Sequence, residues 1–185
     1  MKHLRFAKTA AILCSIVLLV MIGIVASVKL TPKTPKRNDI ISGKTNIVAG
    51  IVTAKPGEKV EFPVYVVNNS RGGFSSMGML LYHDERLIVS LDQNGKPVTK
   101  MGDAADDLTT YFAYKKDKCC VGLAMIGDKR EKEDGIMFTV EITVPSDAKN
   151  GDKYPMTVDI DKLMNKDNQR IEHAAVDGYI IIQTD

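Results

Sequence analysis

The sequence contains no tryptophan and only three cysteines in 185 residues. The lack of tryptophan removes the indole platforms that could hold a sugar, although six tyrosines can partly substitute. Cys119 and Cys120 are neighbours, and in a strand their side chains point to opposite faces, so they cannot form an ordinary disulfide. The fold must therefore depend on a hydrophobic core, for which the about 145 residues beyond the N-terminal region are sufficient.

An excess of charge of one sign is also lacking. The chain has a formal net charge of +2, with 25 basic and 23 acidic residues. Four of the basic residues and none of the acidic ones lie within residues 1–29, so the remainder is slightly acidic. The sequence therefore lacks a basic patch of the kind that would indicate nucleic-acid binding.

Residues that carry catalytic or metal chemistry are few. His83 and His173 are far apart, and neither has another histidine or a cysteine at zinc-ligand spacing. No Gly-x-Ser-x-Gly motif is present, and the acidic residues cluster in turns, where they are typically solvated. A calcium loop starting at Asn165 fails, because Arg170 occupies the glycine position and Val176 the glutamate position. The sequence predicts no enzymatic activity, no metal site and no cofactor.

The N-terminal region contains one long apolar run. Residues 9–28 are uncharged and almost wholly apolar, and as a hydrophobic helix they would be about 30 Å long, enough to cross a bilayer. Basic residues precede the run, which places the remainder of the chain outside the cytoplasm. Residues 1–28 are a signal anchor or a signal peptide. The length of the run favours the anchor, whereas Ala26 and Ser27 would permit cleavage.

The rest of the chain divides into a spacer and one β-rich domain. Residues 29–45 are rich in proline and basic residues and predict an extended spacer, and residues 46–185 form the domain. Short β-rich runs separated by turn residues predict an all-β, nine-stranded sandwich or jelly roll. The nine expected strands lie at residues 47–54, 60–67, 74–87, 87–91, 108–114, 118–126, 136–144, 154–160 and 171–183.

Two of these strands are apolar on both faces. In "FSSMGMLLYHDERL" (residues 74–87) and "KCCVGLAMI" (residues 118–126) the usual alternation of apolar and polar residues nearly disappears. If the two strands are neighbours, six side chains could form one outward apolar patch that binds a partner: Met77, Met79, Leu81, Val121, Leu123 and Met125. Alternatively, both strands lie inside a thick core or are covered by loops.

Four stretches in order resemble the cohesin family. They are "AKPGEKVEFPVYVVNN" (residues 54–69), residues 73–87, "DGIMFTVEITVPSDAKNGDKYPMTVDI" (residues 134–160) and "DGYIIIQ" (residues 177–183). The family's Tyr-Asp-Pro element is replaced here by Tyr82, His83 and Asp84, and Ser75 and Met77 stand in place of a polar pair. The resemblance implies a cohesin-like jelly roll without catalysis. It also implies a receptor for a dockerin, a small helical module that carries calcium itself and belongs to an enzyme or scaffold subunit of a cellulosome.

The resemblance also implies where the partner binds. Cohesins place the dockerin across one sheet, which includes the strands here at residues 75–82, 108–114 and 118–126. The expected partner-binding residues are Ser75, Met77, Met79, Leu81, Tyr114, Val121, Leu123 and Met125. On this interpretation Met77→Asp abolishes dockerin binding and leaves the melting temperature nearly unchanged. The chain would act at the cell surface as a scaffoldin-like module in polysaccharide degradation. A sandwich that binds polysaccharide directly and a surface domain that pairs with its own copies are the alternatives.

Overall fold

The computed structural model of the chain describes residues 37–69, 73–131 and 133–184. The predicted hydrophobic helix at residues 1–28 and residues 29–36 of the predicted spacer lie outside the described residues. In the described part, no helix is long and apolar enough to cross a membrane.

The described residues form strands, turns and one short 3-10 helix, η2 (Lys116–Lys118). The all-β prediction is therefore confirmed, whereas the count of nine strands is not. The strands are β1 (Thr45–Ala49), β2 (Ile51–Ala54), β3 (Lys59–Val67), β4 (Phe74–His83), β5 (Ile88–Val89), β6 (Thr99–Met101), β7 (Thr109–Lys115), β8 (Cys120–Glu131), β9 (Gly135–Thr143), β10 (Lys153–Met164), β11 (His173–Val176) and β12 (Gly178–Ile182).

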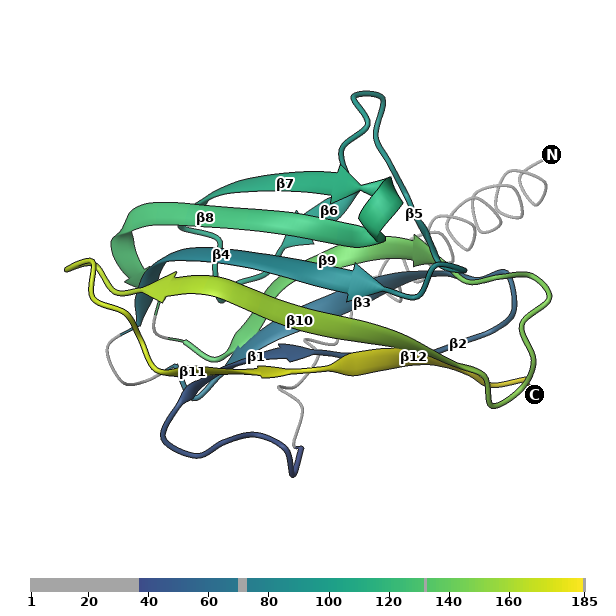
Figure 1. Cartoon of the computed structure of the whole chain (residues 1–185), viewed down its shortest axis with the longest axis horizontal. Coiled ribbons are helices and arrows are strands. Elements are labelled where there is room, and N and C mark those ends of the chain that lie inside the picture. Colours follow the sequence, from purple (N-terminus) through teal and green to yellow (C-terminus); the bar gives the residue numbers. More distant parts are fainter. Residues whose placement is uncertain (1–36, 70–72, 132, 185) are drawn as a thin grey trace, which may run out of the picture. The chain divides into compact units, whose positions relative to one another are not determined.

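Two sheets pack face to face (Figure 1). The first sheet has the order β11-β1-β3-β9-β5, with β6 also paired to β9, and the second has the order β2-β12-β10-β4-β8-β7. All pairings are antiparallel except β1 with β11 and β2 with β12. The inner faces of both sheets supply one continuous hydrophobic core, with Phe62 and Phe138 from the first sheet and Leu81 and Tyr154 from the second.

Two of the predicted strands are divided because the chain changes sheets within them. The stretch predicted at residues 47–54 becomes β1 and β2, and the stretch at residues 171–183 becomes β11 and β12. Glycines stand at both crossing points. A Cβ at Gly178 would collide with the carbonyl oxygen of Gly50, and a Cβ at Gly50 would lie 2.8 Å from the Pro63 ring. Only residues without a side chain let the two backbones approach so closely.

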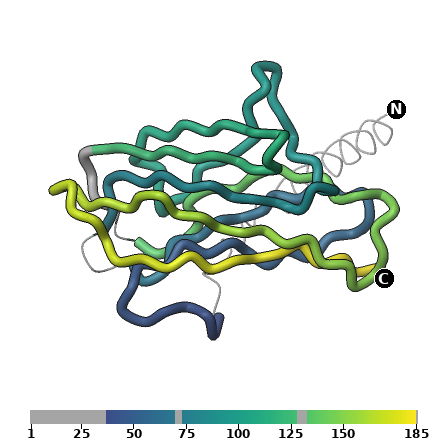
Figure 2. The backbone as a smooth tube through the Cα atoms, in the orientation of Figure 1, coloured from purple at the N-terminus to yellow at the C-terminus, as the bar shows by residue number. Residues whose placement is uncertain are grey.

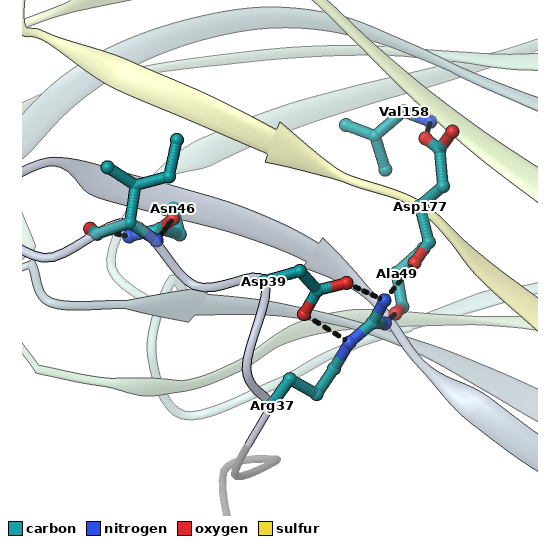
Figure 3. Close-up of polar contacts among 7 residues, drawn as sticks. Arg37, Asp39, Asn46, Ala49, Val158 and Asp177 are labelled. Carbon is teal, nitrogen blue, oxygen red and sulfur yellow. Dashed lines mark hydrogen bonds and ion pairs between the residues drawn. The ribbon is translucent and has the colours of Figure 1, made fainter.

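Arg37 bridges the two chain segments that follow β1 and β11, at the point where the chain passes from the first sheet to the second (Figure 3). Its guanidinium donates hydrogen bonds to the carbonyl oxygens of Ala49 (2.9 Å) and Asp177 (2.6 Å). It also forms a bidentate ion pair with Asp39, and this hydrogen bonding holds the pKa of the Asp39 carboxyl below its usual value. The Asp177 carboxylate in turn accepts a hydrogen bond from the backbone N–H of Val158 (2.9 Å). The guanidinium thus satisfies carbonyl groups that the change of sheet leaves without a strand partner.

The segment at residues 37–44 also covers part of the outer face of the first sheet. Ile40 packs against a second hydrophobic cluster on that face, formed by Val48, Tyr65, Val67 and Val176. The Asn46 side chain, labelled in Figure 3, accepts a hydrogen bond from the N–H of Ile41 (2.8 Å) and donates one to the carbonyl of Ile41 (3.0 Å). It also donates a hydrogen bond to the carbonyl of Lys44 (2.8 Å). The described part of the predicted spacer is therefore held against the domain.

Replacing Arg37 with alanine is expected to lower the free energy of unfolding by about 1–3 kcal/mol, because two carbonyl groups lose a charged donor. Chemical denaturation measures this loss. Lys59→Ala, which removes an exposed ion pair with Glu141, is the control and should have only a small effect. Equal losses in the two variants would show that Arg37 does not stabilise the crossing point.

Candidate partner-binding surface

The six residues predicted to form an outward patch are buried instead. They lie on β4 and β8, which are neighbours as expected, but their side chains point into the core between the sheets. None exposes more than 5% of its surface: Met77 3%, Met79 3%, Leu81 1%, Val121 2%, Leu123 5% and Met125 2%. The prediction that this face is outward is therefore wrong.

The physical reason is side-chain volume. A sandwich core must be filled at close-packed density, and on β4 and β8 the face with Met77, Met79, Leu81, Val121, Leu123 and Met125 carries an unbroken run of large side chains. The other face carries Gly78, Gly122 and Ala124, which are too small to fill the space between two sheets. The larger face therefore turns inward.

The two other predicted contact residues are not on an accessible face either. Ser75 is buried, with 5% of its surface exposed. Tyr114 packs against the core, and its ring stacks on the ring of His83. The Tyr114 hydroxyl lies 3.2 Å from Nε2 of His83. The other ring nitrogen of His83 lies 2.8 Å from the carbonyl oxygen of Asp84, to which it donates. Tyr114 is thus a structural residue that fixes His83 at the end of β4.

β4 and β8 do have a second apolar face, and it lies on the outside of the sheet, opposite the buried face with Met77 and Leu123. It continues onto β7 at the edge of the sheet. Tyr111 stands opposite Ala124, and Ala113 stands opposite Gly122, which pairs with Leu80 on its other side. Tyr111 is 67% exposed and Ile126 is 62% exposed. We call this surface the outer patch, and its members are Leu80, Tyr111, Ala113, Ala124 and Ile126.

Glycines keep the outer patch flat. A Cβ at Gly122 would lie 3.4 Å from Cδ2 of Leu80, so the absent side chain gives Leu80 room to lie over the neighbouring strand. At Gly78 the nearest atom to such a Cβ would be a carboxylate oxygen of Asp161, at 3.9 Å. A flat apolar surface across adjacent strands can bind one face of a helix, because small side chains let the helix approach closely.

Charged residues border the outer patch on two sides. On β10, Asp159 and Asp161 are exposed, and Asp159 pairs with Leu80. At the turn between β7 and β8, three lysines lie on the surface: Lys115, Lys116 and Lys118. An apolar centre with a charged rim is the usual composition of a protein-binding surface.

The described residues contain no group of three or more His, Cys, Asp or Glu side chains that could hold a metal ion. His173 lies far from His83 along the chain and contacts the carbonyl oxygen of Ile171 (2.8 Å). Cys119 and Cys120 are both free thiols, and burial raises the pKa of the Cys120 thiol. Cys119 ends η2 with a positive φ of 47°.

A sequence model of the Cohesin domain matches residues 45–182 of the chain. Among curated proteins, a cellulosome-anchoring protein of Acetivibrio thermocellus is 28% identical over 112 residues. This alignment covers 57% of the chain but only 24% of the relative, so the chain spans about a quarter of that protein's length.

Solved cohesins have the same fold. A cohesin in a type I cohesin–dockerin complex from Clostridium thermocellum gives a TM-score of 0.66 at 19% identity, covering 76% of this chain and 99% of that chain. A non-cellulosomal cohesin from Archaeoglobus fulgidus gives 0.63 at 18% identity, covering 76% and 92%. A type III cohesin from the cell-surface anchoring scaffoldin of Ruminococcus flavefaciens gives 0.61 at 21% identity, covering 76% and 87%. The family match runs from the first residue of β1 to the last residue of β12, and the chain belongs to the Cohesin domain family.

Proposed function

We propose that this chain is a receptor that binds a dockerin module on the outer patch and so recruits dockerin-bearing subunits at the cell surface. Cohesin domains are non-catalytic protein-binding modules. Similar structures from Clostridium thermocellum and Acetivibrio cellulolyticus are complexes of a cohesin with a dockerin. The observation that carries the proposal for this chain is the exposed apolar surface on β4, β8 and β7.

Binding would draw its free energy mainly from burial of the outer patch. Ile126 and Tyr111 are the large exposed members, and their burial would contribute about 25 cal/mol per Å² of apolar surface. The lysines at the turn between β7 and β8 lie at the rim, where charges affect the association rate more than the affinity. Dockerin residues that contact this end are expected to be acidic.

Titration of the full chain with a panel of purified dockerins tests the proposal. The chain should be kept in detergent because of the apolar run at residues 9–28. We expect saturable binding of at least one dockerin at a one-to-one ratio, measured by calorimetry. The panel should include non-cellulosomal dockerins, because the similar cohesin from the archaeon Archaeoglobus fulgidus is non-cellulosomal. Failure of every dockerin to bind would contradict the proposal.

Calcium is expected on the dockerin and not on this chain. Adding EDTA should abolish the complex, because the helical partner loses its metal ions, and should leave the melting temperature of the chain alone unchanged. Differential scanning calorimetry of the chain with and without EDTA is the control. A fall in its melting temperature would show that this chain itself binds a metal ion.

Attachment at the cell surface would come from the N-terminal apolar run. We expect the intact chain in the membrane fraction of the native cells, with a mass that includes residues 1–28. Mass spectrometry of the chain extracted from that fraction makes the measurement. A soluble chain that begins near residue 28 would instead show that the run is a signal peptide.

A further inference from the structure

A groove runs along the edge of the second sheet, beside the outer patch. One wall is the hairpin that joins β5 to β6, and the other is the middle of β7. Figure 2 shows this hairpin projecting beyond the strands of the sandwich. The groove has a volume of about 450 Å³, within the range of small-molecule sites. Its lining includes Asp92, Lys96, Val98, Thr99, Tyr111 and Phe112.

The hairpin wall is held rigidly. The Asp92 carboxylate accepts hydrogen bonds from the backbone N–H groups of Asn94 (2.8 Å) and Lys96 (2.9 Å). These bonds hold the pKa of the Asp92 carboxyl below its usual value, and the bond from the Lys96 N–H has the largest effect. The carboxyl group is therefore charged at neutral pH. The Val98 N–H donates to the carbonyl of Ser90 (2.8 Å), and the Val98 carbonyl accepts from Glu141 (3.0 Å). The wall is therefore formed before any ligand arrives.

The groove combines aromatic surface with hydroxyl and charged groups. Phe112 is half-buried at the bottom of the groove, where its ring packs against the core and makes an edge-to-face contact with Phe138, with ring centroids 5.2 Å apart. Tyr111 presents a ring that is 67% exposed. The hydroxyl of Thr99, the carboxylate of Asp92 and the ammonium group of Lys96 supply donors and acceptors.

We propose that this groove binds a polysaccharide chain directly. A sugar ring has apolar C–H faces that pack on aromatic side chains and hydroxyl groups at its edge that need hydrogen-bond partners. The exposed ring of Tyr111 at the rim of the groove can pack on a sugar face, and the polar groups of the hairpin can bond its hydroxyl groups. The open groove suits a chain that extends beyond it on either side. This function goes beyond dockerin binding, and apart from Tyr111 the groove residues named here lie outside the outer patch.

Isothermal titration of the full chain with cellohexaose and with xylohexaose tests the proposal, in a detergent without a sugar headgroup. At least one oligosaccharide should bind. Tyr111→Ala should weaken binding at least tenfold, and Lys96→Ala and the nearly isosteric Thr99→Val should each weaken it about three- to tenfold. The matched control is Tyr179→Ala on β12 of the same sheet, which should leave the affinity unchanged.

Two outcomes would overturn the proposal. One is the absence of binding at millimolar oligosaccharide. The other is that Lys96→Ala and Thr99→Val both bind the oligosaccharide with wild-type affinity and keep the wild-type melting temperature. That result would show that the sugar binds elsewhere on the chain. Dockerin affinity separates this function from the proposed receptor role. Lys96→Ala should lower sugar affinity and leave dockerin affinity unchanged, whereas a loss of dockerin affinity without any sugar binding would assign the groove to the docking surface.

Discussion

Replacing Met77 with aspartate is expected to unfold the domain. Met77 is 3% exposed and belongs to the core between the two sheets, in register with Met125 on β8 and Leu163 on β10. A carboxylate there would be buried without a partner, and the methionine's packing contacts would be lost as well. We expect a loss of more than about 4 kcal/mol, a large part of the about 5–15 kcal/mol by which natural domains are stable.

Thermal unfolding followed by circular dichroism measures this effect. The matched control is Ser76→Asp, because Ser76 directly precedes Met77 on the same strand and faces outward. That variant should keep a melting temperature close to the wild type. If Met77→Asp instead folds with an unchanged melting temperature, Met77 is not part of the core and the assignment of the two faces is reversed.

Replacing Ile126 with aspartate is expected to abolish dockerin binding and to leave the fold intact. Ile126 is 62% exposed, so a carboxylate at this position stays solvated in the free chain. In the complex the carboxylate would be buried against apolar side chains of the partner. The affinity should fall at least 100-fold, about 2.7 kcal/mol, which is typical of a residue that contributes strongly to an interface.

The control for this variant lies on the same sheet. Ile51 on β2 is 49% exposed, and β2 is at the opposite edge of the sheet from β7. Ile51→Asp makes the same chemical change away from the outer patch and should leave the dockerin affinity unchanged. Equal losses of affinity in the two variants would indicate that binding does not depend on the outer patch.

The class of fold could be predicted from local signals in the sequence. Turn residues such as Pro56 and Gly57 separate β-rich runs, and most of these runs are strands in the structure. The strand count could not be predicted, because a change of sheet leaves the local β-rich pattern almost unbroken. Gly50 and Gly178 mark both crossing points, yet a single glycine within a strand also indicates a bulge.

The orientation of β4 and β8 could not be predicted from hydrophobicity alone, since both faces of each strand are apolar. Side-chain size was the informative signal. Met77, Met79 and Leu81 form an unbroken row of large side chains, whereas Gly78 and Gly122 interrupt the opposite faces. A row that contains glycine cannot fill a core, so it belongs on the outside.

Tyr111 and Arg37 illustrate a different limit. Tyr111 belongs to a surface assembled from strands far apart in the sequence, and β7 and β4 become parts of one face only because β8 lies between them. Arg37 lies in a proline- and lysine-rich stretch whose composition predicts a solvated spacer, and its carbonyl partners follow 12 and 140 residues later. Contacts of this range depend on topology, which local patterns do not contain.

The structure of this chain bound to a dockerin, solved by crystallography, tests the central claim most directly. We predict that helices of the dockerin lie across β4, β8 and β7 of the second sheet and cover Ile126 and Leu80. A dockerin that instead contacts the first sheet, or that leaves Ile126 exposed to solvent, would contradict the claim.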